Sequence, residues 1–147
     1  MDIQQIIEAV RGFDGALAVV PDTDPYPELA WGDAFFYFAP DGVMPQRTQP
    51  YGTITTKDYQ DDTAFRLGPD RFRVNLHVGR DKAAELSDAG AQPTGTDAFL
   101  PHPLYGTMGW VCVVNPAANT AQQVLDLLRE AHDAARARTL RRAESGE

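Results

Sequence analysis

Four short strand-like segments follow one another between residues 16 and 78, and no helical segment separates them. Residues 16–20 are apolar, residues 35–38 are consecutive aromatic side chains, and residues 51–57 are rich in β-branched threonine. Residues 72–78 alternate between apolar and polar side chains. The aromatic segment is apolar on both faces, so it should be a central strand. Parallel strands need a long crossover, usually a helix, so this series predicts antiparallel pairing.

Amphipathic helices are expected at both ends of the chain. Near the N-terminus, Asp2 can cap a helix and Gln5 lies three residues later, which is the spacing of a capping box. A fifth strand is expected over residues 109–114. Beyond it, apolar residues return at helical spacing: Val124, Leu127, Leu128, Ala131 and Ala135.

These elements predict an α+β fold, a mostly antiparallel sheet of about five strands with the N- and C-terminal helices packed on one face. The 147 residues fit one domain, because a chain of this length typically builds a single core. Residues 1–147 are therefore expected to form a single domain, in which about 139–147 are a flexible polar tail.

The charge and hydropathy of the chain argue against two classes of partner, nucleic acids and membranes. Its formal net charge is −8, and five of its 13 basic residues are arginines at or after position 129. Most of the chain therefore repels a phosphate backbone, which argues against nucleic-acid binding. Stabilisation by the helix dipole is the simpler explanation for the terminal arginines, although contact with an anionic partner stays open. No apolar run reaches the length of a membrane helix and no leader is recognisable, so we expect a cytoplasmic protein without membrane contact.

Residue spacing argues against a metal or a cofactor. The single cysteine, Cys112, lies within a strand-like segment, where a thiol usually acts as a small buried apolar group. The three histidines, His77, His102 and His132, form none of the usual metal-ligand spacings. Glycine-rich phosphate loops and a nucleophile elbow are also missing from the sequence. We therefore expect no metal and no cofactor, and we expect each histidine at the surface or at the boundary of the core.

Several blocks carry a resemblance to known families: AWGDAFFYFAPDG (30–42), LPHPLYGTMGWVCVVNP (100–116) and LLREAHDAAR (127–136). They resemble a family of bacterial domains of unknown function over almost the whole chain. More distantly, the order of elements is similar to the YjbR/MmcQ-like proteins, which implies a compact α+β fold. The first family has no established activity, so the resemblance supports the fold and transfers no catalytic residue.

One strand face and one proline-rich segment supply the candidate ligand site. The alternation in residues 72–78 places Arg73, Asn75 and His77 together, opposite the apolar side chains. His102 is held extended between two prolines, and Tyr105 follows in the same segment. We expect a ligand beside His77 and His102, with Arg73, Asn75 and Tyr105 nearby. Arg73 favours an anionic ligand, because a guanidinium can hold a carboxylate bidentately. The alternative is that this strand face is simply solvated.

Both tryptophans are expected to be largely buried, with Trp110 packed against the sheet core. They lie in the strongest strand-like blocks, and burial of such a large aromatic group dominates the local energetics.

Two functions fit these observations. The first is a non-enzymatic module that binds a small ligand or another protein, because no catalytic constellation is recognisable. The second is a small-molecule enzyme that uses His77 or His102 as general acid or base, since histidine titrates near neutral pH. A pocket joining both histidines to an acidic side chain such as Asp33 would favour the enzyme. A homodimer is a further expectation, with no interface assigned.

Overall fold

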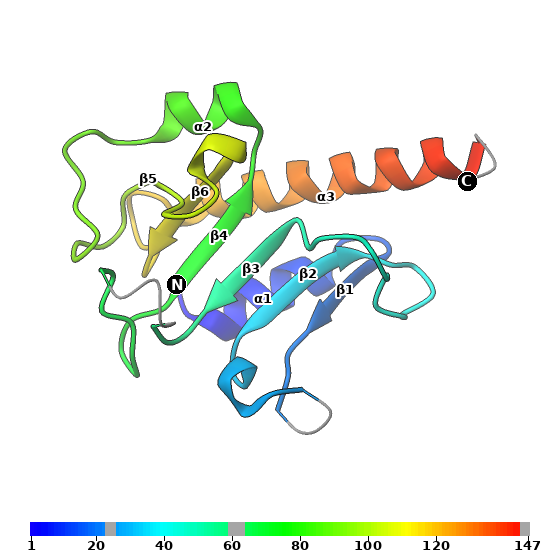
Figure 1. The fold of residues 1–147 in the computed structure, drawn as a ribbon, viewed down its shortest axis with the longest axis horizontal. Coiled ribbons are helices and arrows are strands. Elements are labelled where there is room, and N and C mark those ends of the chain that lie inside the picture. The colour runs from blue at the N-terminus through cyan, green and yellow to red at the C-terminus, as the bar shows by residue number, and fades with distance from the viewer. Residues whose placement is uncertain (23–25, 59–63, 145–147) are drawn as a thin grey trace.

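The sheet organises the molecule. The computed structural model describes residues 1–22, 26–58 and 64–144. In this part of the chain, six antiparallel strands form one sheet in the order β1-β2-β3-β4-β6-β5 (Figure 1). The strands are β1 (Ala16–Val19), β2 (Ala34–Phe38), β3 (Gly52–Thr55), β4 (Arg73–His77), β5 (Leu100–Pro101) and β6 (Trp110–Val114). The expected antiparallel sheet is confirmed, and the short β5 adds a strand at its edge.

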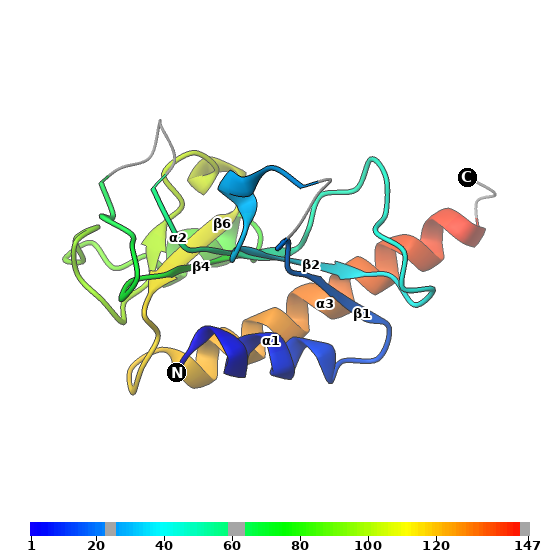
Figure 2. The ribbon, with the colours of Figure 1, turned by 90° about the horizontal axis from the view of Figure 1, so that it is seen from below.

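The terminal helices cover one face of this sheet. The helices of the described residues are α1 (Ile3–Arg11), α2 (Arg80–Leu86) and α3 (Ala121–Glu144), with short 3-10 turns η1 (Glu28–Ala30) and η2 (Gly106–Met108). In Figure 2, α1 and α3 lie together below the sheet. The predicted α+β fold with both terminal helices on one face is therefore confirmed. None of these helices is long and apolar enough to cross a membrane.

The N-terminal capping box forms as its sequence predicts. The Asp2 carboxylate accepts a hydrogen bond from the backbone N–H of Gln5 at 2.8 Å. The Gln5 side chain accepts one from the backbone N–H of Asp2, also at 2.8 Å. These two bonds satisfy donors that a helix start otherwise leaves unpaired. The terminal ammonium of Met1 also donates to the Pro116 carbonyl at 3.0 Å, which joins the start of α1 to the segment before α3.

The core fills the space between the sheet and these two helices. Val74 and Leu76 of β4 are fully buried, as the alternation of this strand predicts. They pack in one cluster with the apolar faces of α1 and α3. The close approach of α3 requires a glycine in β3, because a Cβ on Gly52 would lie 2.9 Å from Leu128 Cδ2. A second, smaller cluster on the other sheet face contains Phe65, Leu100, Cys112 and Val114.

The C-terminal helix is longer than the expected element. α3 continues to Glu144, so residues 139–144, which we expected to belong to a polar tail, are helical. Residues 145–147 lie outside the described residues. The last turns of α3 extend past the end of the sheet in Figure 1.

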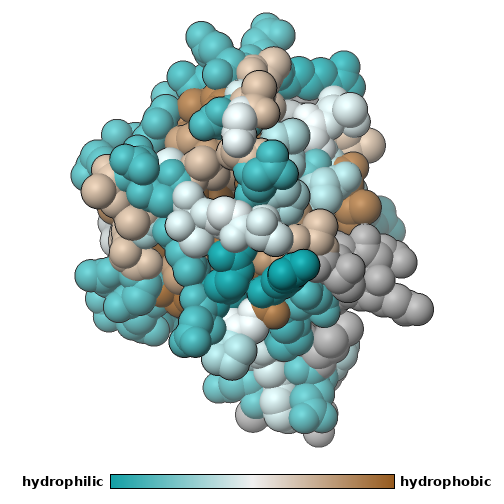
Figure 3. Space-filling model, turned by 90° about the vertical axis from the view of Figure 1, so that its left-hand side faces the viewer, coloured by the Kyte–Doolittle hydropathy of each residue, from teal (hydrophilic) through white to brown (hydrophobic). Residues whose placement is uncertain are grey.

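One turn carries half of the large exposed apolar side chains in the described residues. At the end of the molecule that carries β5, hydrophilic and hydrophobic residues are interspersed among the coloured atoms (Figure 3). Of the six large exposed apolar side chains in the described residues, three belong to the turn before β6, namely Leu104, Tyr105 and Met108.

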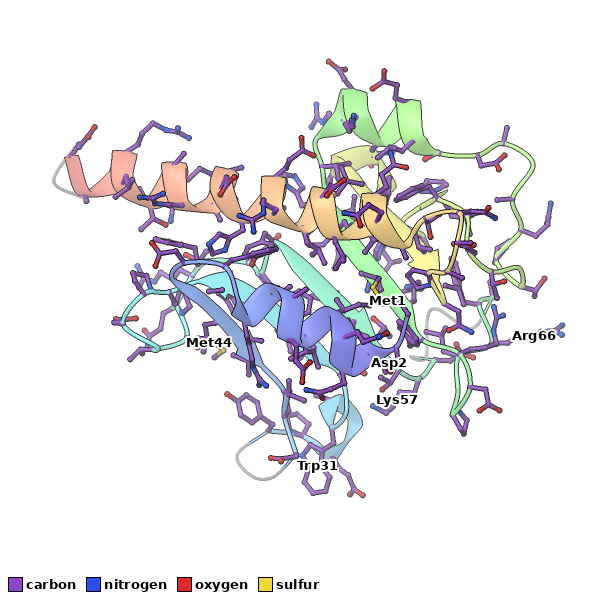
Figure 4. The ribbon with its side chains drawn as sticks, turned by 180° about the vertical axis from the view of Figure 1, so that it is seen from behind. Met1, Asp2, Trp31, Met44, Lys57 and Arg66 are labelled. Carbon is purple, nitrogen blue, oxygen red and sulfur yellow. The ribbon has the colours of Figure 1, made fainter. Side chains whose placement is uncertain are left out.

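Neither tryptophan belongs to the buried core clusters, so the expectation that Trp110 packs against the sheet core is wrong. Trp31 follows η1 at the periphery of the molecule (Figure 4), is only partly buried, and donates its indole N–H to the Tyr26 carbonyl at 3.2 Å. Trp110 begins β6 and is also only partly buried. It shares the strand face of Cys112, which α1 and α3 do not cover.

Asp97 holds the segment before α3 in place. Its backbone has a φ of 57°, and its carboxylate accepts hydrogen bonds from three backbone N–H groups and one hydroxyl, those of Ala117, Asn119 and Thr120. Burial opposes ionisation of this carboxyl, but the hydrogen bonds outweigh it and lower the pKa of Asp97. Thr120, which directly precedes α3, donates its hydroxyl to Asp97 at 2.6 Å.

Asp97→Asn should lower the free energy of unfolding by about 1 kcal/mol at neutral pH, because an amide replaces one acceptor oxygen with a donor. The lowered pKa of Asp97 means that its contribution is complete above the ordinary carboxyl pKa and is lost as pH falls through the native one. The difference between parent and variant in urea unfolding should therefore shrink between about pH 5 and pH 2. Asp126→Asn, an exposed change on α3, should stay within about 0.5 kcal/mol of the parent. A constant difference across this pH range would contradict the capping role.

Candidate functional site

Arg73 and Asn75 lie in a buried polar network on the sheet face that the helices leave uncovered. The Asn75 amide donates to the hydroxyls of Thr53 and Thr55, both at 2.9 Å. Its oxygen accepts a hydrogen bond from Arg73 Nε at 2.8 Å. The Arg73 guanidinium carbon lies 4.7 Å from the centre of the Phe65 ring. The exposed fractions of Arg73 and Asn75 are only 3% and 2%.

A solvated strand face is therefore the wrong description for these two residues. The Asn75 side chain bonds to Arg73 and to two hydroxyls of β3, so it connects the neighbouring strands β3 and β4. Neither of them lines the two pockets at His77 that are described below. The structure thus separates Arg73 and Asn75 from the other three predicted site residues.

His77, His102 and Tyr105 do come together, around the indole of Trp110. The ring centres of His77 and Trp110 are 5.5 Å apart, and those of His102 and Trp110 are 6.3 Å apart. The Tyr105 ring lies 5.0 Å from that of His102. Pairing of β4 with β6 explains the first contact, because His77 is directly opposite Trp110. The two histidine rings, which we predicted to lie close together, therefore both lie near the indole of Trp110.

His102 has a local structural task. Its Nδ1 accepts hydrogen bonds from the backbone N–H groups of Leu104 and Tyr105, at 3.1 and 3.2 Å. Its side chain is buried, with an exposed fraction of 9%. An Nδ1 that accepts these bonds carries no proton, so this nitrogen holds the turn before β6 rather than a ligand.

A pocket of about 300 Å³ opens between the end of β4, the segment before β3 and α3. It is lined by Arg47, Thr48, Gln49, Pro50, Tyr51, His77, Tyr105, Met108, Trp110, Arg138 and Arg142. We call it the arginine pocket. Three of its residues are arginines, although the chain as a whole has a net charge of −8. The arginine pocket is therefore a local concentration of positive charge on an acidic protein.

A second pocket of about 310 Å³ adjoins the first, and the two share His77 and Arg138. Lys82 of α2 and Glu130 of α3 line it together with apolar residues of α3. We call it the adjoining pocket. His77 and Arg138 consequently stand where the two spaces meet.

Arg138 occupies an unusual electrostatic position. It is partly buried, and within the described residues it forms no ion pair with an acidic side chain. Burial, and then the charges of Arg142 and Arg141, lower its pKa. A guanidinium stays protonated even so, which leaves a charge that repels its neighbours. An anion at this position would offset that repulsion.

The environment of His77 keeps its imidazole neutral. Burial is the largest cause that lowers the pKa of His77, and the charge of Arg138 acts in the same direction. A backbone hydrogen bond at Met108 acts against them without reversing the shift. The lowered pKa leaves the His77 ring largely uncharged at neutral pH, and its protonation requires a pH below the ordinary histidine range.

Sequence reasoning missed the arginines of this site. Arg138 and Arg142 are one turn apart on α3, a spacing that places them on the same helix face. The pattern was visible, but an amphipathic helix alone does not indicate what its basic face meets. Arg47 precedes β3 and has a φ of 63°, a backbone conformation that costs a non-glycine residue about 1 kcal/mol or more. Nothing in its local sequence marks it as a site residue.

The constellation that would have favoured an enzyme does not form around Asp33. The register aligns Ala34 with Ile54 and Val74, which places the neighbouring Asp33 toward the opposite end of the sheet from His77. The Asp33 carboxylate instead accepts hydrogen bonds from the backbone and hydroxyl of Thr56, at 2.8 and 2.6 Å.

His132 is a core residue, so the expectation of a surface or boundary position is wrong for it. Its exposed fraction is 3%. Its Nε2 lies 2.8 Å from the Asp14 carbonyl, and its Nδ1 lies 3.0 Å from the Tyr51 hydroxyl. Because a carbonyl only accepts, Nε2 donates and Nδ1 accepts from Tyr51. Among the residues that the structure describes, no three His, Cys, Asp or Glu side chains gather as a metal site.

Gly109 fixes the end of β6 against the end of β4. Its carbonyl accepts hydrogen bonds from Val78 and Gly79, at 2.8 and 3.1 Å. Its φ is 90°, and a Cβ at this position would lie 2.6 Å from the carbonyl carbon of Gly79. Gly109 therefore permits the close backbone contact that brings His77 beside Trp110.

Gly109→Ala should be clearly more destabilising than Gly42→Ala. Both glycines have a positive φ, but a Cβ on Gly42 meets nothing within 4 Å. Gly42→Ala should therefore cost only the backbone strain of about 1 kcal/mol, whereas Gly109→Ala should cost at least about 2 kcal/mol more through the backbone clash. Urea unfolding of the two variants measures this difference. Equal losses of stability would show that the contact with Gly79 is unimportant.

Comparison with known proteins agrees with the resemblance to a family of unknown function. A family model described as "Family of unknown function (DUF6194)" matches residues 1–144. Neither a curated protein nor a solved structure matches the chain. The similarity to YjbR/MmcQ-like proteins stays a prediction, because no match supports it. The match covers nearly the whole sequence, and the chain therefore belongs to the DUF6194 family.

Proposed function

We propose that this protein is a non-enzymatic module that binds a small anionic ligand in the arginine pocket. The observation that carries the proposal is Arg138, a partly buried guanidinium without an acidic partner in the described residues and close to two further arginines. A ligand that brings negative charge to this position relieves a repulsion that the free protein contains.

The composition of the pocket supports an anion over a neutral ligand. Arginine presents a planar fork of N–H donors, which suits the oxygens of a carboxylate, phosphate or sulfate. Arg47 precedes β3 and Arg138 lies on α3, so two such forks from distant parts of the chain line one pocket. The aromatic side chains of Tyr51, Tyr105 and Trp110 line the same pocket beside these arginines.

A small-molecule enzyme that uses His77 as general base is the second candidate. The lowered pKa of His77 supports it, because a neutral imidazole at the edge of the pocket can accept a proton. His102 is less suited to this role, because its Nδ1 already accepts two backbone hydrogen bonds. If the parent protein releases nitrophenolate from p-nitrophenyl phosphate and His77→Gln abolishes this release, the result would favour the enzyme. Recovery of the unchanged ester after prolonged incubation would favour the binding module.

Sulfate should bind to the parent protein and should bind about tenfold more weakly to Arg138→Gln, because charge-assisted hydrogen bonds to the anion are lost. Arg136→Gln is the matched control, since it removes the same charge from an exposed position on the same helix. It should leave the affinity within about twofold of the parent. Titration followed by NMR chemical shifts measures both constants. Equal weakening in the two variants would mean that only net charge matters, and the pocket would not be the site.

Sulfate should also bind more tightly at about pH 5 than at about pH 8. The lowered pKa of His77 leaves its ring neutral at the higher pH, and protonation at the lower pH adds a positive charge beside the anion. The other charged residues that face this position are Arg47, Lys82, Glu130, Arg138 and Arg142. Sulfate keeps its charge over this range. A difference in affinity between titrations at the two pH values therefore reports a change in the protein and not in the ligand. In His77→Gln the pH dependence should disappear, and its persistence would assign the effect to another group.

A further inference from the structure

We infer that the ligand of the arginine pocket is a phosphate monoester attached to a planar ring, of the kind represented by a nucleoside monophosphate. This inference rests on the proposed function and adds the chemical class of the ligand. It follows from three properties of the pocket: its aromatic wall, its number of arginines, and the second space next to it.

The aromatic wall favours a flat ring. Trp110 and Tyr105 line the same pocket, and each is partly or largely exposed in the free protein. His77 and His102 contact the indole at interplanar angles of 56° and 67°, so neither of them stacks in parallel on it. Met108 extends the apolar surface, with an exposed fraction of 60%. A planar ring is the ligand group that covers such a surface by stacking and by sulfur–aromatic contact.

The number of cations favours a phosphate monoester over a carboxylate. Arg47, Arg138 and Arg142 all line the pocket, and the charges of Arg142 and Arg141 act on Arg138. A carboxylate carries one negative charge, whereas a phosphate monoester carries about −1.5 to −2 at neutral pH and offers three acceptor oxygens. The phosphate therefore matches more of the guanidinium forks and compensates more of their mutual repulsion.

The adjoining pocket gives room for a ligand of two parts. It shares His77 and Arg138 with the arginine pocket, so a ligand that contacts these two side chains also borders the adjoining space. Lys82 and Glu130 offer it a hydrogen-bond donor and an acceptor, respectively.

Isothermal titration calorimetry with three probes tests the inference: AMP, adenosine and ribose 5-phosphate. AMP should bind at least about tenfold more tightly than either fragment, because only AMP has both the ring and the phosphate. In a Trp31→Phe background, AMP should also shift the single remaining indole N–H signal in the NMR spectrum, that of Trp110. Ribose 5-phosphate should shift this signal less.

Two substitutions separate the contribution of ring stacking to the affinity from the contribution of the phosphate. Tyr105→Ala should weaken the binding of AMP by about fivefold and leave the affinity for ribose 5-phosphate unchanged, because it removes only the stacking partner. Leu104→Ala is its matched control: Leu104 is exposed in the same turn and does not line the pocket. Arg138→Gln should weaken AMP and ribose 5-phosphate equally and leave adenosine unchanged. These exposed or partly exposed positions avoid the risk that a Trp110 variant fails to fold.

The outcomes separate this inference from the proposed function. Equal affinities for AMP and ribose 5-phosphate would overturn the inference that the ligand carries a planar ring, and so would binding of sulfate without binding of AMP. Either result would leave the proposed anion site intact. Equal affinities for AMP and adenosine would overturn both statements, as would failure of AMP and sulfate alike to bind. Tighter binding of AMP together with the two selective losses would support both.

Discussion

The pairing of β4 with β3 on one side and β6 on the other is the interaction on which the rest of the structure depends. Its register sends Val74 and Leu76 into the core beneath α3, and Arg73 and Asn75 into the polar network on the opposite face. A slip of one residue would exchange these two sets. The guanidinium would then lie against apolar helix residues, at a large cost in free energy. The core and the polar network therefore specify the same register.

The same register determines where the pocket lies. His77 ends β4 opposite Trp110, and the positive φ of Gly109 lets the following backbone segments meet. Arg138 reaches this place because the apolar stripe of α3 is packed on the sheet and the helix continues past its end. The arginine pocket thus depends on a strand end, a helix extension and the segment before β3, none of which is adjacent in the sequence.

Local patterns predicted much of the fold and part of the site. The capping box at Asp2, the alternation of β4 and the apolar stripe of α3 each follow from short-range chemistry, and each appears in the structure. Burial of Arg73 and Asn75 did not follow from their strand, because the residues that cover them, such as Phe65, come from a segment without regular structure. The two-residue β5 is likewise too short for a periodic signal.

The sequence by itself determined which face of each element is apolar, and with it the antiparallel α+β fold, because side-chain periodicity and helix capping act within a few residues. The sequence raised the proximity of His77 and His102 only as a hypothesis, and the pairing of β4 with β6 decided it. Only the tertiary structure decided that Trp110 stands between the histidines, that Arg73 is internal, and that arginines of α3 supply the positive charge. The physical reason is that convergence of distant side chains depends on strand order and helix docking, which the packing of the whole core sets.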